Sequence, residues 1–176
     1  MDMFEKIERT RHFGEMLLLW LWYRSDVNDT VFYLSDGSAV ILAVDNQLTL
    51  ESKMTEMERT VLSGGAPSDS REAYEALRQG KVVSQMKIRL QRDEKEWVFV
   101  LNGATLDISS LKIPALMTKN DDEKLYERMG LIEEVDGLIR GLYEQYLDIR
   151  LDPGKWRAEE KDILEWIDRK ASGAEE

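Results

Sequence analysis

The sequence predicts an α+β fold with antiparallel meander sheets, a buried N-terminal helix and two C-terminal helices. Three observations lead to this prediction. Apolar residues recur at helical spacing near both ends of the 176-residue chain. In the middle of the chain they alternate with polar residues, as they do in half-buried strands. The links between these alternating runs are short, which is typical of antiparallel strands and excludes a doubly wound parallel sheet.

Composition indicates a folded chain in a reducing compartment. Apolar residues make up 43% of the sequence, enough to bury a core. The chain has no cysteine, which excludes a disulfide scaffold, a thiolate metal site and a cysteine nucleophile. Its first residues are charged, and its longest apolar run, 16–22, is shorter than the roughly 20 residues of a membrane span. We therefore expect a cytoplasmic protein with no membrane partner.

The N-terminal third is predicted to combine one helix with short strands. Residues 10–24 are apolar nearly all round, so this helix should be buried on most faces. Short strands are expected at residues 31–34, 39–44, 47–51 and 56–63. Turn sequences separate them at Asp36-Gly37 and at Asp45-Asn46.

A segment rich in glycine, proline and serine marks the strongest break in the chain. It covers residues 64–69 and is predicted to be a linker. It divides the chain into 1–63, a helix plus strands, and 70–176, a helix, a three-strand meander and a C-terminal helical pair. The alternative is that both parts belong to one compact unit.

The middle of the chain is predicted to form a short helix and then a meander. The helix, residues 70–79, has a capping-box pattern in Asp69 and Glu72 and a stop at Gly80. Strands are expected at residues 81–91, 97–101 and 104–108. Asn102-Gly103, between apolar runs, is a strong hairpin signal for the second connection.

Two helices are predicted to complete the chain. Residues 121–149 carry apolar side chains at spacings of three and four, as a long amphipathic helix does. Asp152-Pro153 has the form of a helix cap followed by proline at the first helical position. The last helix, residues 153–170, places an apolar stripe on one side, made of Trp156, Ile163, Trp166 and Ile167.

Charge is distributed unevenly along the chain. The net charge of −11 argues against a simple nucleic-acid binder. Residues 71–95, however, carry seven bases against four acids, whereas residues 121–176 carry 17 acids against nine bases. This asymmetry between a basic middle and an acidic end is the compositional feature that a function has to explain.

The basic middle contains a row of cations on one predicted strand and its adjoining turn. The candidate DNA-binding residues are Lys81, Lys87, Arg89, Arg92 and Lys95. Cations about 6.6 Å apart along a strand can meet successive phosphates. Such contacts would be independent of DNA sequence and sensitive to salt. The alternative is an ordinary solvated strand face whose cations pair with local acids, and the sequence leaves both open.

No pattern of catalytic or metal-binding residues emerges. His12, the only histidine, has no partner at a spacing suited to a metal or a general base, and Gly64-Gly65 lacks the Lys-Ser/Thr of a phosphate loop. The acidic runs 121–123 and 133–134 are expected to be solvated helix positions. The five tryptophans are expected to pack in the core and not to stack on bases. The sequence therefore predicts no catalytic residue, no metal and no cofactor.

Several segments, in their order, resemble the recombination-associated protein RdgC family. Residues 14–25, GEMLLLWLWYRS, are similar to the family's G-x-x-F-L-x-W-L-W-x-R-S helix. Further similar segments are residues 80–83 (GKVV), 96–101 (EWVFVL), 110–114 (SLKIP), 131–134 (LIEE) and 150–156 (RLDPGKW). The likeness spans roughly residues 13–168, and longer members carry a large N-terminal portion that this chain lacks.

The resemblance implies a non-catalytic protein that binds duplex DNA independently of sequence and modulates RecA-type recombination or replication. It implies a nucleoid-associated protein, with Lys81 of the GKVV segment as a DNA contact. A recombinase and a second copy of the chain are further candidate partners, since long members form ring-shaped dimers with a basic hole under an acidic exterior. The alternative is a protein–protein interaction module whose acidic final helices face a basic partner. A metal-dependent nuclease has the least support.

Overall fold

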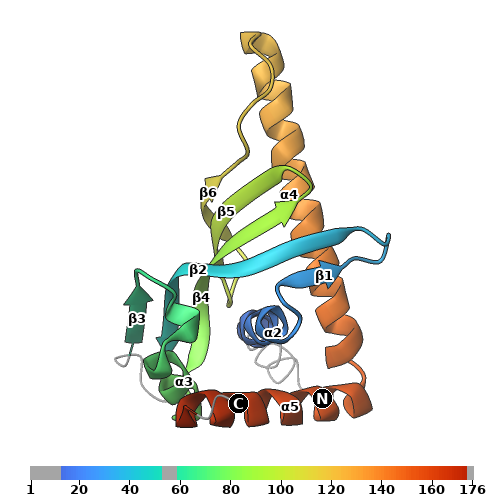
Figure 1. Ribbon diagram of the computed structural model, residues 1–176. Coiled ribbons are helices and arrows are strands. Elements are labelled where there is room, and N and C mark those ends of the chain that lie inside the picture. Colours follow the sequence, from blue (N-terminus) through green and yellow to red (C-terminus); the bar gives the residue numbers. More distant parts are fainter. Residues whose placement is uncertain (1–12, 53–58, 174–176) are drawn as a thin grey trace, which may run out of the picture.

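The computed structural model describes residues 13–52 and 59–173 (Figure 1). Helices in these ranges are α2 (Phe13–Val27), the 3-10 helix η1 (Pro67–Asp69), α3 (Arg71–Arg78), α4 (Asp121–Arg150) and α5 (Pro153–Ser172). Strands are β1 (Val31–Tyr33), β2 (Ala39–Glu51), β3 (Arg59–Ser63), β4 (Val82–Arg92), β5 (Lys95–Asn102) and β6 (Ile108–Lys112). The predicted α+β class, with a buried N-terminal helix and two C-terminal helices, is confirmed.

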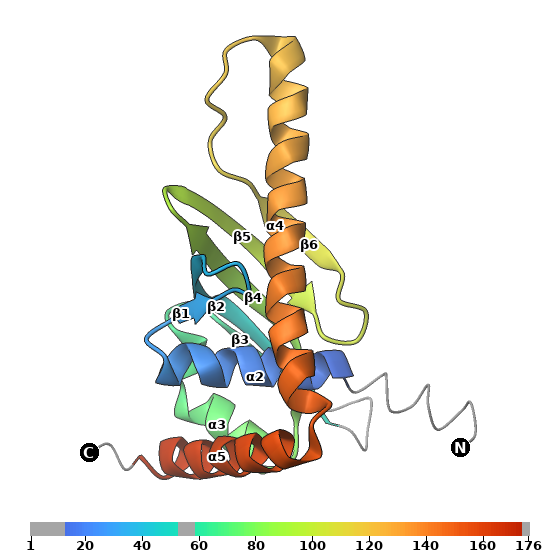
Figure 2. The same cartoon turned by 90° about the vertical axis from the view of Figure 1, so that its right-hand side faces the viewer.

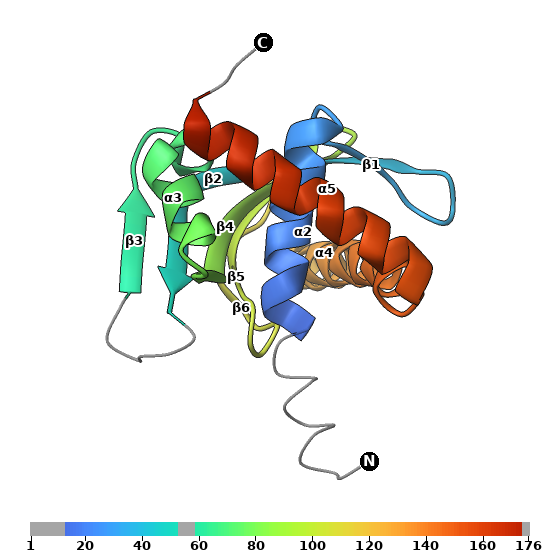
Figure 3. The ribbon, with the colours of Figure 1, turned by 90° about the horizontal axis from the view of Figure 1, so that it is seen from below.

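The described strands form one antiparallel sheet of order β1-β2-β4-β5-β6, with β3 paired to β2. The β2–β4 pairing brings strands from both sides of residues 64–69 into this sheet. Helices α2 and α4 lie on the same side of the curved sheet (Figures 1 and 3). Alternate residues of β4, such as Ile88 and Leu90, are buried beneath them, whereas Lys87 and Arg89 point to the opposite side, called here the open face.

Helix α2 lies at the centre of the core, as its continuous apolar sequence predicts. Leu17, Leu18 and Trp22 are each at most 1% exposed, because α2 packs on the sheet and α5 crosses its other side (Figure 3). All five tryptophans are buried, which confirms the prediction that they belong to the core. No helix within residues 13–52 and 59–173 has both the length and the apolar character that crossing a bilayer requires.

Strand β2 is continuous where a turn at Asp45-Asn46 was predicted, so that prediction is wrong. Its pairing with β4 is interrupted by an irregularity between Val44 and Leu48 and resumes beyond it. A bulge of this kind places extra residues in one strand without ending the sheet. The polar pair is accommodated because both side chains reach Lys87 on the neighbouring strand.

Strand β6 begins at Ile108, so the predicted strand over 104–108 is also wrong. The Asn102 Oδ1 atom accepts hydrogen bonds from the N–H groups of Ala104 and Thr105 at 2.9 and 3.1 Å. These bonds keep the chain turning beyond Asn-Gly, and Leu106 continues the loop with a positive φ of 61°. The hairpin therefore closes with Leu101 opposite Ile108.

The helix ends agree with prediction at α5 and differ at α3. Asp152 caps α5 by accepting the N–H groups of Gly154 and Lys155, with proline at the first helical position. Ser70 rather than Asp69 is the N-cap of α3, and no side chain caps it, because Asp69 belongs to the preceding 3-10 turn. The predicted capping box is therefore wrong.

Candidate functional site

The five predicted cations fall into three places. Lys87 and Arg89 lie side by side on the open face, whereas Arg92 and Lys95 contact α4. Lys81 precedes β4, and its Nζ donates a 2.8 Å hydrogen bond to a threonine hydroxyl on β3. The cations therefore do not form one continuous surface.

Carboxylates on the open face pair with its two cations. Asp45 lies 3.5 Å from Lys87 Nζ and 3.6 Å from a guanidinium nitrogen of Arg89. Arg89 also donates to Glu96 at 3.0 Å, and Lys87 donates to the Asn46 side chain at 2.9 Å. This is the arrangement that the alternative reading of the basic strand described.

Glu134 on α4 holds the other pair of cations. It accepts hydrogen bonds from Arg92 and, at 2.8 Å, from Lys95. Burial raises the pKa of Glu134, but the hydrogen bonds from both cations outweigh burial, and the net shift is downward. These two cations, together with the two on the open face, meet three carboxylates, which leaves a single net positive charge.

A projection of the chain, residues 113–134 and called here the arm, extends beyond the sheet from a base at which Leu131 and Glu134 contact β4 and β5. An extended segment rises from β6, and the first turns of α4 return beside it (Figure 2). Glu127 on α4 joins the two, because its carboxylate accepts the N–H groups of Met117 and Thr118 at 2.5 and 3.0 Å. These two backbone hydrogen bonds lower the pKa of Glu127. The arm is therefore an ordered projection.

The arm exposes an apolar stripe at helical spacings of four and three: Leu125, Met129 and Ile132. Their exposures are 59%, 50% and 47%. Of the eleven large apolar side chains exposed within residues 13–52 and 59–173, five lie on this 22-residue arm, so they are clustered. Clustered exposed apolar side chains mark interaction sites. The sequence did not indicate that this stripe is exposed, because its apolar spacing is the same as that of the buried half of the helix.

Replacing Glu127 with glutamine is expected to loosen the arm. A glutamine side chain offers one acceptor oxygen, and its NH₂ group would oppose the second backbone N–H. Hydrogen exchange at Met117 and Thr118 should become several-fold faster than in the wild type. Glu133→Gln is the matched control, because Glu133 is exposed and has no ion pair in the described chain. Unchanged protection of both amides in the Glu127 variant would contradict this account.

Acid should loosen the arm in the same way. Because the pKa of Glu127 is lowered in the folded arm, its hydrogen bonds are fully present above the ordinary value of 4.5. They are lost as the pH falls through the lower folded value. Amide protection at Met117 and Thr118, corrected for the intrinsic exchange rate, should therefore fall with pH in the wild type and stay low in Glu127→Gln.

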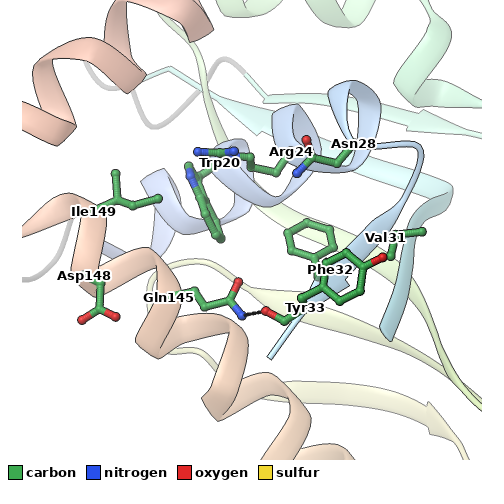
Figure 4. Close-up of a pocket in the computed structure, with 9 residues that line it drawn as sticks. All are labelled: Trp20, Arg24, Asn28, Val31, Phe32, Tyr33, Gln145, Asp148 and Ile149. Atoms are coloured by element: carbon green, nitrogen blue, oxygen red, sulfur yellow. Dashed lines mark hydrogen bonds between the residues drawn. The ribbon is translucent and has the colours of Figure 1, made fainter. Parts of the chain in front are cut away.

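A pocket of about 340 Å³ lies between α2, β1 and α4 (Figure 4). Two of its polar side chains, Arg24 and Gln145, have partners inside the protein. Arg24 on one wall is bound by both carboxylate oxygens of Glu159, at 2.6 and 2.8 Å. Gln145 on another wall donates to the backbone oxygen of Tyr33, the contact drawn in Figure 4. We interpret the pocket as a gap between packed elements.

Metal chemistry has no visible support in the described ranges. Within residues 13–52 and 59–173, no three histidine, cysteine, aspartate or glutamate side chains come together in a way that could hold a metal ion. His12 lies outside the described residues.

Comparison of the sequence with protein-family models finds no match, and comparison with curated proteins finds none either. The resemblance to the RdgC family therefore rests on the segments quoted above.

Proposed function

We propose that this chain is a non-catalytic binding protein that modulates DNA recombination or replication by engaging another protein with its arm. The observation that carries the proposal is an ordered projection with an exposed apolar stripe, found together with predicted DNA-binding cations that are mostly paired internally. The resemblance to the RdgC family supports recombination or replication as the process that the protein modulates. Such a role would place the protein at the nucleoid, with a recombinase among its candidate partners.

Electrostatics favours a protein partner over duplex DNA. Exposed ion pairs contribute only about 0–1 kcal/mol each, so phosphates could displace the carboxylates that bind Lys87 and Arg89. The displaced Asp45 and Glu96 would nevertheless remain beside the DNA backbone and repel it. With a net charge of −11 on the whole chain, attraction to DNA through this face should be weak.

Duplex DNA binding is the second candidate, and one further cation favours it. Lys112 on β6 and Arg89 on β4 both lie opposite Val98 of β5, so they are two strands, about 10 Å, apart. Lys112 is exposed and has no ion pair within the described residues. Together with Lys87, these residues would form a row of cations on the open face that could follow a phosphate backbone, although Lys112 was not among the predicted DNA contacts.

A salt titration of binding to a DNA duplex separates the two candidates. If the open face binds DNA, removing Lys87 and Arg89 should flatten the log–log salt dependence by about two, and Asp45→Asn should tighten binding. Our proposal expects neither change, with affinity no better than about 10⁻⁴–10⁻⁶ M at physiological salt. Tight binding to the duplex that Asp45→Asn strengthens would make DNA binding the favoured function.

A pull-down from nuclease-treated extract of the source cells tests the protein partner. The tagged chain should retain a bound protein after nuclease treatment, and Met129→Asp should release it, since a charge in the stripe prevents burial. Gly130→Ala is the matched control: it lies next to Met129 on another side of α4, where an added Cβ meets no atom within 4 Å. Loss of the bound protein with nuclease alone would point to a DNA tether.

A further inference from the structure

We infer that the arm receives an α-helix of a partner protein whose apolar ridge is flanked on one side by lysine or arginine side chains. This inference names the kind of partner for the arm and so rests on the function proposed above. The relevant surface consists of the apolar stripe, Leu125, Met129 and Ile132, and of the charged side chains beside it.

The geometry of the stripe suits a helical partner. Spacings of four and three residues are those of the seam along which two helices pack. The stripe is about 10 Å long, from the rise of 1.5 Å per residue. Farther along α4 the same spacing passes through the exposed Asp136 before it reaches Ile139 and Tyr143, which pack on the core of the molecule. The exposed stripe is thus a separate apolar segment of α4, on another side of the helix from the buried residues Leu131, Val135 and Leu138.

The rest of the arm does not cover this stripe. The extended segment is hydrogen-bonded to Glu127, and Glu127 is two residues from Met129. Two residues of an α-helix correspond to about 200° of rotation, so the extended segment lies against the opposite side of α4. Its hydrogen bonds keep it there, which leaves the stripe accessible to an external helix.

Charges beside the stripe select the partner. Asp122 and Glu133 lie along one flank, are exposed and have no ion pair within the described chain, whereas the exposed Arg128 lies along the other flank. Residues 113–134 as a whole carry six acids and three bases, and one of the acids, Glu134, is paired with Arg92 and Lys95. Two arms that pack antiparallel would therefore bring the Asp122 and Glu133 flanks together, whereas a helix with one basic flank would find complementary charges there. These charges favour a basic helix over a second copy of this chain.

The test uses a synthetic 20-residue peptide as the probe, added to the full chain and followed by fluorescence anisotropy. The peptide has leucines at spacings of three and four and lysine or arginine on one flank of the leucine ridge. It should bind with a dissociation constant on the order of micromolar, as expected for a small interface. Two control peptides, one with glutamate on that flank and one with the same composition in scrambled order, should bind at least about tenfold more weakly.

Substitutions in the arm locate the binding. Met129→Asp and, independently, Leu125→Asp should each weaken binding of the peptide by at least about tenfold, because each places a charge in the apolar stripe. The double variant Asp122→Asn/Glu133→Gln should weaken it several-fold, with a shallower salt dependence. Gly130→Ala should leave it unchanged. All five positions are exposed, and circular dichroism and thermal melting verify that each variant is folded.

Three results would overturn the inference. Equal binding of the scrambled peptide would show that charge attraction alone explains the binding. Absence of peptide binding, with a pull-down that still depends on Met129, would leave the proposed function intact and dismiss the basic helix. Self-association of the wild type that Met129→Asp abolishes would identify a second copy as the occupant.

Discussion

Replacing Trp166 with alanine is expected to lower the free energy of unfolding by about 3–5 kcal/mol, among the largest effects of any single substitution in this chain. Trp166 on α5 is 1% exposed. Its ring lies 5.5 Å from those of Trp22 and Tyr23 and 5.3 Å from that of Tyr74, measured between centroids. One side chain therefore joins α5 to both α2 and α3.

The cost should lie near the upper part of that range for two reasons. The cavity left by the indole would be lined by rigid aromatic rings, which cannot collapse into it as flexible side chains do. Trp166 also donates its Nε1 hydrogen to Asp26 at 2.7 Å, so that the carboxylate would keep only Lys170, at 3.3 Å. Loss of a partner from a partly buried carboxylate adds to the loss of packing.

Urea unfolding followed by circular dichroism measures the effect. Trp166→Phe keeps most of the apolar contact and loses the hydrogen bond, so it should cost less than the alanine variant. Glu160→Ala, at an exposed position of the same helix, should stay within about 0.5 kcal/mol of the wild type. A loss below about 1 kcal/mol for Trp166→Ala would mean that α5 is held mainly by other contacts.

Features that depend on neighbouring residues were predictable from the sequence. The start of α5 follows from Asp152 and Pro153, because a cap acts on backbone groups two and three residues away. The stripe that includes Trp166 follows from helical periodicity, and its members are buried as expected. The continuous apolar sequence of α2 likewise predicts a helix surrounded by other elements.

Strand boundaries were less predictable, because distant pairing decides them. Asp45-Asn46 is a common turn sequence, yet the alignment of β2 with β4 on both sides of it keeps the strand continuous. Asn102-Gly103 is a common two-residue hairpin, yet hydrogen bonds that the asparagine side chain accepts from the backbone extend the loop. Local turn chemistry was present in both places, and tertiary pairing determined its outcome.

Predicting the candidate site from sequence failed for a related reason. Period-two spacing correctly put Lys87 and Arg89 on one face, but Asp45 comes from a distant strand and could not be assigned as their partner. In the same way, a spacing of three and four identifies apolar positions without showing which of them find a neighbour. Leu125 and Leu142 belong to the same predicted helix, and only the second is buried.

Removing the carboxylate of Glu159 is the second large effect, with an expected loss of about 2–4 kcal/mol for Glu159→Ala. This carboxylate binds Arg24 through both oxygens, and the oxygen at 2.6 Å also accepts the Trp20 Nε1 hydrogen at 2.9 Å. The range is lower than for a fully buried pair, because the Arg24 side chain is 29% exposed and that of Glu159 is 10% exposed. Both Arg24 and Trp20 belong to α2, so Glu159 attaches the final helix to the core.

A double-mutant cycle shows whether the loss comes from charges left unpaired. Arg24→Leu should also destabilise the protein, since it leaves Glu159 buried without its cation, whereas Arg24→Leu combined with Glu159→Leu should recover much of the loss. Glu159→Gln should be intermediate, because an amide oxygen still accepts the Trp20 hydrogen bond. Chemical unfolding of the wild type, Arg24→Leu, Glu159→Leu and the double variant gives the coupling energy, which we expect to exceed about 1 kcal/mol. Additive losses, with no recovery in the double variant, would show that the packing of α5 and not the ion pair holds it to α2.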